Sequence, residues 1–196
     1  MSIHQILIMT HSIVQIRRAF GFFFINIAIL VSSGSVVSEI AFQNDVPLYY
    51  YVMIWIIISS LIVGLQFRKF KLVFSSIRQR MRNSTKWSLQ IKVINGLCWA
   101  LPFALIIFFP ELSQYLLLLG IGLGNISTFV FMNKFNGLNN KEQLVVGITS
   151  LVLILPAFKI DSSFFLENQD IAVLLSRLFI ALSYAIGGIY ALYQKD

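Results

Sequence analysis

Long runs of apolar residues alternate with short polar segments along the whole chain. We expect each run to form one helix, over residues 20–37, 48–67, 89–109, 112–132, 144–158 and 171–193. A helix needs about 20 predominantly apolar residues to cross the hydrocarbon core of a bilayer. The run at 144–158 is short, and we expect Lys159 and Ile160 to extend it toward the surface. The pattern predicts an all-α polytopic membrane protein, a bundle of about six transmembrane helices forming a single domain over 1–196.

Two polar segments carry helical periodicities of their own. Residues 1–18 predict a short helix that lies on the membrane interface before the first crossing. The segment 68–86 predicts an amphipathic helix, with an apolar face made of Phe70, Val73, Phe74, Ile77 and Met81. Its opposite face is basic and includes Lys71, Arg78, Arg82 and Lys86. Such a helix binds anionic lipid headgroups or packs on a partner protein; the simpler alternative is that its charges only orient the chain.

The signs of the loop charges predict the orientation of the bundle. Lys and Arg accumulate in cytoplasmic loops of membrane proteins. Eight of the fifteen basic residues lie between residues 68 and 92, a stretch without any acid, whereas the segments 39–47 and 161–170 contain acids and no base. Tyr49, Tyr50 and Tyr51 predict an aromatic belt at the outer interface. We therefore expect both termini to be cytoplasmic, in a protein of the plasma membrane.

Composition supports this class and limits the possible functions. Hydrophobic residues make up 58% of the 196 positions and charged residues only 12%, against about 25% charged residues in soluble domains. The net charge of +7 is explained by the cytoplasmic loops, so we expect the lipid bilayer as a partner and no nucleic acid. The single cysteine, Cys98, excludes an internal disulfide.

Small residues recur at helical spacing on two of the expected spans. Gly120 and Gly124 form a G-x-x-x-G motif in the fourth span. Ser183, Gly187 and Ala191 make a similar stripe on the sixth span. Such stripes allow helices to approach closely within a membrane. We interpret both as helix-packing surfaces, since the glycines lie inside an apolar run and not between a strand and a helix, where a phosphate-binding loop would be.

Arg177 is the clear charged residue inside an expected span. A guanidinium that faces lipid is costly, so intramembrane arginines reach outward to the surface or pair with an acid. Glu39 and Glu111 are the acids expected at the same level. The functional alternative is that Arg177 faces an internal cavity and binds an anionic group.

The sequence contains no catalytic, metal-binding or cofactor-binding signature, so we expect a protein that is not an enzyme. Two hypotheses remain. The first is a non-catalytic, helix-packing subunit of a larger membrane complex, with other membrane protein subunits as partners. The second is a small transporter or channel component that binds an uncharged or anionic solute near Arg177 and Asn125. Pro102 and Pro156 favour the second, because broken helices line solute sites.

Overall fold

The computed structural model describes residues 3–47, 49–68, 70–71, 74–75, 78, 87–136, 139–164 and 169–194, with the side chains left out at 3–16, 136, 163–164 and 169–170. Regular structure in these residues is entirely helical. The elements are α1 (Ile3–Gln43), α2 (Tyr49–Leu65), α4 (Leu89–Leu105), the 3-10 turn η1 (Pro110–Leu112), α5 (Ser113–Asn136), α6 (Lys141–Val152), α7 (Ile154–Phe164) and α8 (Gln169–Tyr193). The all-α prediction is thus confirmed.

Helix α1 is longer than the sequence pattern suggested at both ends. The separate interfacial helix expected over residues 1–18 is wrong for the described part, because one helix runs without a break from Ile3 to Gln43. No Gly or Pro interrupts residues 3–20, so nothing in the backbone forces a turn there. At the other end the helix includes Glu39, which we had assigned to a loop.

Helix α1 ends at Gln43 and is capped by a Schellman motif in which Asp45 is the left-handed residue. The amide of Asp45 donates to the carbonyl of Phe42 (3.0 Å) and that of Val46 to the carbonyl of Ala41 (3.0 Å). Asp45 has a φ of 53°, the left-handed conformation that this cap requires and that Asp tolerates better than most residues. The chain therefore reverses at 44–47, and α2 begins directly afterwards.

The expected fifth span is two helices in the structure. Leu153 separates α6 from α7, and Pro156 lies in the first turn of α7, where its missing N–H is tolerated. Helix α7 continues to Phe164, so Asp161 is helical and partly buried instead of lying in an external loop. In the same way α6 begins at Lys141, before the expected fifth run at 144–158, and Glu142 is 1% exposed.

Four helical stretches of the described residues are long and apolar enough to cross a membrane. They are Arg17–Gln43, Pro110–Phe135, Lys141–Ser162 and Ile171–Tyr193. Helices α2 and α4, with 17 residues each, are apolar but shorter. The structure therefore supports a membrane protein with four long spans.

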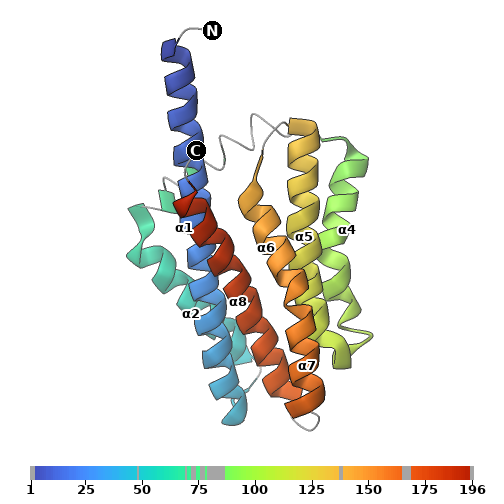
Figure 1. Ribbon diagram of the computed structural model, residues 1–196. Coiled ribbons are helices and arrows are strands. Elements are labelled where there is room, and N and C mark those ends of the chain that lie inside the picture. Colours follow the sequence, from blue (N-terminus) through green and yellow to red (C-terminus); the bar gives the residue numbers. More distant parts are fainter. Residues whose placement is uncertain are drawn as a thin grey trace.

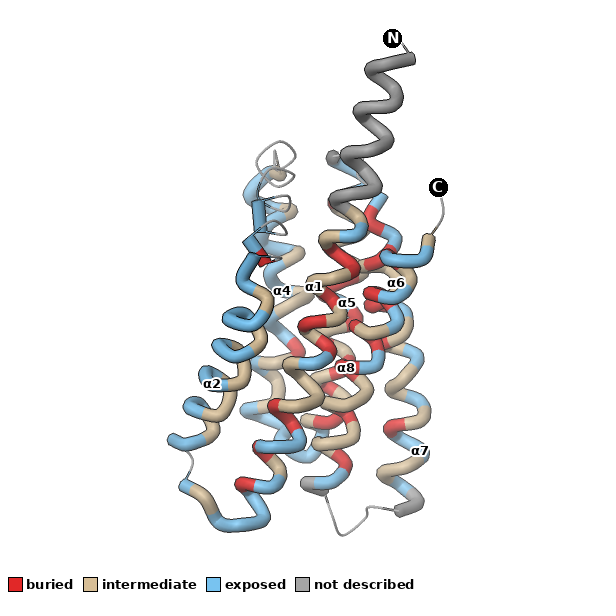
Figure 2. Tube along the Cα trace, turned by 90° about the vertical axis from the view of Figure 1, so that its left-hand side faces the viewer, coloured by how far each residue is buried: buried red, intermediate tan, exposed pale blue. Residues whose placement is uncertain are grey.

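The bundle has a packed centre and two peripheral helices (Figure 1). Helices α1, α8, α6 with α7, and α5 surround a core that includes Phe24, Leu118, Val146 and Tyr184. Helix α2 packs on α1, and α4 packs on α5. Figure 2 shows the burial that results, with buried positions concentrated on the central helices and α2 exposed along most of its length. The beginning of α1 and the end of α8 lie at the same end of the bundle (Figure 1).

Candidate functional site

The predicted packing stripe on α5 lies against α4 of the same chain. A Cβ added at Gly120 would lie 2.7 Å from the ring of Phe103, and one added at Gly124 would lie 2.3 Å from the indole of Trp99. Each glycine therefore makes room for an aromatic ring of the neighbouring helix. Trp99 also donates its Nε1 hydrogen to Thr128 (3.1 Å).

The second predicted stripe, on α8, is also occupied within the chain. A Cβ at Gly187 would lie 2.3 Å from the side chain of Val146 on α6. Ser183 is fully buried, and Ala191 faces Gly21 on α1. Gly21 and Gly188 bring α1 and α8 into backbone contact, since a Cβ at Gly188 would lie 2.9 Å from the Gly21 carbonyl oxygen. These stripes hold the protein's own helices together and leave no small-residue face for a partner there.

Asn125, which we had placed near a solute, makes an interhelical hydrogen bond. Its Nδ2 donates to the Ile121 carbonyl (2.9 Å) and to the Tyr184 hydroxyl (3.4 Å). Asn125 is 2% exposed and does not line either of the two cavities described below. Its position in the core is that of a packing residue.

The segment 68–86, called the basic segment below, contacts α1 through the apolar residues Phe70 and Phe74. Phe70 is buried and its ring lies edge-on to that of Phe22, with centroids 5.6 Å apart. Phe74 makes a similar contact with Phe23 at 6.4 Å. Lys71 and Arg78 are exposed, as expected for the opposite face. Arg82 and Lys86 lie outside the described residues, so the predicted binding face is only partly visible.

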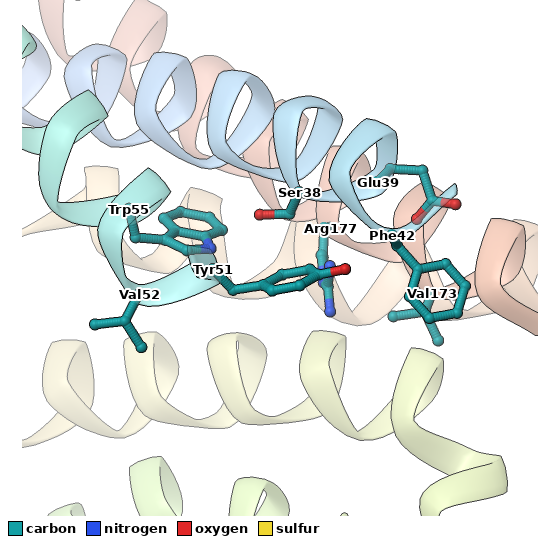
Figure 3. Close-up of a pocket in the computed structure, with 8 residues that line it drawn as sticks. All are labelled: Ser38, Glu39, Phe42, Tyr51, Val52, Trp55, Val173 and Arg177. Carbon is teal, nitrogen blue, oxygen red and sulfur yellow. The ribbon is translucent and has the colours of Figure 1, made fainter. Parts of the chain in front are cut away.

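A cavity of about 510 Å³ lies between α1, α2 and α8, near the end of the bundle where α1 turns into α2. Its lining residues are Ser38, Glu39, Phe42, Tyr51, Val52, Trp55, Val173 and Arg177 (Figure 3). Each helix contributes residues one turn apart: Ser38 and Phe42, Tyr51 and Trp55, and Val173 and Arg177. Ligand pockets in proteins are typically 300–1,000 Å³, mainly apolar, with a few convergent polar groups. This cavity has that character.

Arg177 and Glu39 both line this cavity, and no ion pair between them is present in the described residues. Among the side chains that the structure describes, neither a hydrogen bond nor an ion pair joins Arg177 to an acid. Glu39 instead accepts a hydrogen bond from Gln43 (3.3 Å), one turn along α1. Glu111 is exposed, on η1, and does not line the cavity. Arg177 thus lies on a wall of this cavity.

Three further groups supply hydrogen-bond donors to the cavity. Ser38 is 2% exposed, and its Oγ has no partner, whereas Ser32 and Ser33 on the same helix donate to carbonyls of the preceding turn. Trp55 presses the far edge of its six-membered ring against Gly34. Figure 3 shows its indole nitrogen and the Ser38 hydroxyl pointing into the space between α1 and α2, with the Tyr51 hydroxyl nearby.

A second, smaller cavity of about 160 Å³ lies between α1, α2 and the start of the basic segment. Its walls are almost entirely apolar and include Ile27, Ile62, Phe70 and Phe74. Asn26 also lines it, donating to the Phe22 carbonyl (2.8 Å) while its Oδ1 has no partner. The two cavities flank the contact between Gly34 and Trp55, where α1 and α2 approach closely.

Sequence reasoning singled out Arg177 and Glu39 but missed most of the cavity. Tyr51 was assigned to an interfacial belt, and Ser38, Phe42 and Trp55 were not singled out at all. The sequence pattern that could have indicated these cavity residues is weak. It consists only of pairs of polar or aromatic residues at i, i+4 within apolar runs. Elsewhere in the described residues, no group of three or more His, Cys, Asp or Glu side chains lies close enough together to hold a metal ion.

Comparison of the chain with protein-family models, with curated protein sequences and with solved structures finds no match. Its function is therefore argued from the chemistry of this cavity.

Proposed function

We propose that the chain crosses the membrane six times, with α2 and α4 as two short additional crossings and both termini in the cytoplasm. Seventeen residues is at the lower limit for a transmembrane helix. The basic residues that follow α2 support a cytoplasmic position for that end. Single cysteines, introduced after replacing Cys98, test this orientation: in intact cells, an impermeant maleimide should label position 45 and not position 71. Labelling at position 71 and not at position 45 would show that the orientation is the opposite of the one we propose.

We propose further that the protein is a non-catalytic, solute-binding membrane protein, a small transporter or channel component that holds its ligand beside Arg177. The supporting observation is the 510 Å³ cavity, which combines a guanidinium without an ion-pair partner in the described residues with aromatic walls. A charge in such surroundings is costly unless a partner satisfies it, and an anionic ligand group would do so through the planar fork of Arg177.

Ligand-induced stabilisation tests this function directly. A ligand that binds only the folded state raises the unfolding temperature. The parent protein, in maltoside detergent, would be screened against small carboxylates, phosphates, sulfonates and polyols. We expect at least one anionic probe to stabilise the parent protein and the control Lys159→Gln, whose side chain is exposed outside the cavity. Arg177→Gln and the cavity-filling Val173→Phe should both abolish the shift. Equal shifts in all four proteins, or none in any, would refute the function.

A second candidate is the helix-packing subunit of a larger membrane complex. Helix α2 favours it, because this helix has no buried residue and exposes Val52, Ile56, Leu61 and other large apolar side chains. The packing stripes on α5 and α8 do not, since the chain's own helices cover them. Purification from its native membrane in mild detergent separates the candidates: a stoichiometric partner that is lost on Ile56→Ser and Leu61→Ser supports the subunit, and a monomer opposes it.

A further inference from the structure

We infer that the ligand of the α1–α2–α8 cavity is zwitterionic, carrying an anionic oxygen-bearing group and an ammonium group. This inference rests on the proposed solute-binding function and names its chemical class. It comes from the charge balance of the cavity, whose lining residues include one base and one acid, Arg177 and Glu39. A purely anionic ligand would satisfy the base and leave the acid beside a second negative charge.

Several hydrogen-bond donors line the cavity. In Figure 3 the Ser38 hydroxyl and the Trp55 indole nitrogen point into it from the side opposite Glu39 and Phe42, and Arg177 is drawn between the two sides. Ser38 Oγ is buried without a partner, and the ring of Trp55 is held in place by Gly34. A guanidinium together with hydroxyl and indole donors matches the several acceptor oxygens of a phosphate or carboxylate.

The acidic side of the cavity suits a cation. Glu39 lies beside Phe42, the residue three positions further along α1, and in Figure 3 the Phe42 ring lies on the Glu39 side of the cavity. The carboxylate is engaged in the described residues only by the amide of Gln43, which leaves acceptor capacity. An ammonium group held between a carboxylate and an aromatic face gains both an ion pair and a cation–π contact.

A zwitterion would satisfy both charges at once, because its oxyanion would bind Arg177 and its ammonium group would bind Glu39, two residues not joined by an ion pair in the described structure. This chemistry occurs in the headgroup of a zwitterionic phospholipid and in small soluble zwitterions. The shared feature is the pairing of an oxyanion with an ammonium in one molecule, and the experiment is designed to distinguish the two sources.

Calorimetric titration of the protein in maltoside with four soluble probes tests the inference. The probes are phosphocholine, choline, inorganic phosphate and glycerol. We expect phosphocholine to bind at least about tenfold more tightly than phosphate or choline, since each charged contact contributes about that factor. Arg177→Gln should reduce phosphocholine affinity to that of choline, and Glu39→Gln to that of phosphate. Glu111→Gln, which removes an exposed acid outside the cavity, is the matched control and should leave all affinities unchanged.

The outcomes separate the inference from the function on which it depends. If phosphate binds as tightly as phosphocholine and Glu39→Gln has no effect, the site is an anion site: the zwitterion inference fails and the solute-binding function survives. To assign the source, the protein is placed in nanodiscs of phosphatidylglycerol with and without phosphatidylcholine. Competition between phosphatidylcholine and soluble phosphocholine identifies a headgroup site, and undiminished phosphocholine binding identifies a soluble ligand. If neither the soluble probes nor phosphatidylcholine binds, the zwitterion inference fails; the solute-binding function fails with it only if the carboxylates and sulfonates of the stabilisation screen also produce no shift.

Discussion

The two neighbours of α1 contact it in opposite ways. On the α8 side, Gly21 and Gly188 allow the backbones to touch, and Phe24 packs edge-on against Tyr184 with centroids 5.5 Å apart. On the α2 side, Gly34 and Trp55 make a close contact with a cavity on either side of it. One helix therefore has a closely packed face and a face with unfilled space. The difference indicates that the α8 side supplies stability and that the α2 side has room for a ligand.

This contrast has a physical basis in the side chains of each interface. Glycine and alanine on α8 remove the volume that would keep two helices apart, so dispersion contacts form where Gly21 meets Gly188 and Ala191. Helix α2 carries Trp55 and Ile62 toward α1, and Gly34 is the glycine of α1 that makes room for Trp55. Large side chains meeting at one point leave gaps above and below it.

The same substitution should have opposite effects on the two sides, and this is the largest difference we expect. Ser183→Leu adds volume at a fully buried position on α8 and should lower the free energy of unfolding by about 1–3 kcal/mol or more, as overpacking does. Ser59→Leu fills the 160 Å³ cavity on the α2 side and should be neutral or stabilising by up to about 1 kcal/mol. Unfolding in mixed micelles of increasing dodecyl sulfate content measures both.

Ser60→Leu is the control for added hydrophobicity, because Ser60 is exposed on the adjacent position of α2. It should change stability little. A destabilisation by Ser59→Leu equal to that of Ser183→Leu would mean that the cavity is closed in solution and that the α1–α2 contact is packed as closely as the core around α8.

A smaller difference is expected from adding one methyl group on each side. Gly188→Ala places a Cβ 2.9 Å from the carbonyl oxygen of Gly21, and a backbone atom cannot move without separating the helices, so we expect a loss of about 1–2 kcal/mol. Gly34→Ala meets the far edge of the Trp55 ring at 2.6 Å. That ring can turn toward the neighbouring cavity, and alanine favours the helix by about 1 kcal/mol, so the net change should be close to zero.

The readout for this pair is the apparent unfolding temperature together with the fluorescence of Trp55 in a background where Trp87 and Trp99 are replaced by Phe. A shift in the emission maximum in Gly34→Ala, with unchanged stability, would show that the ring has moved into the cavity. A loss of stability in Gly34→Ala as large as in Gly188→Ala would contradict the contrast.

The sequence predicted the helices better than their ends. Apolar runs identify α2, α5 and α8 closely, because lipid requires such runs. The end of α1 depends on a left-handed Asp45, which has no distinctive pattern. Pro156 indicated a break in the fifth run, but the sequence did not show that the break falls at Leu153. Arg177 was identified because a charge inside an apolar run stands out. Ser38 and Trp55 did not stand out, because the sequence does not show which face of a helix meets a cavity.

The pairing of α1 with α8 joins the first helix of the chain to the last. During synthesis α1 enters the membrane long before α8 exists, and until then its glycine-containing face at Gly21 meets only lipid or transient neighbours. Closing a long loop adds only a slowly growing entropic cost, about 0.6 kcal/mol for each doubling of length, so the late arrival of α8 is tolerated thermodynamically. It delays completion of the bundle, however, and a chain interrupted before residue 171 lacks the helix that completes its core.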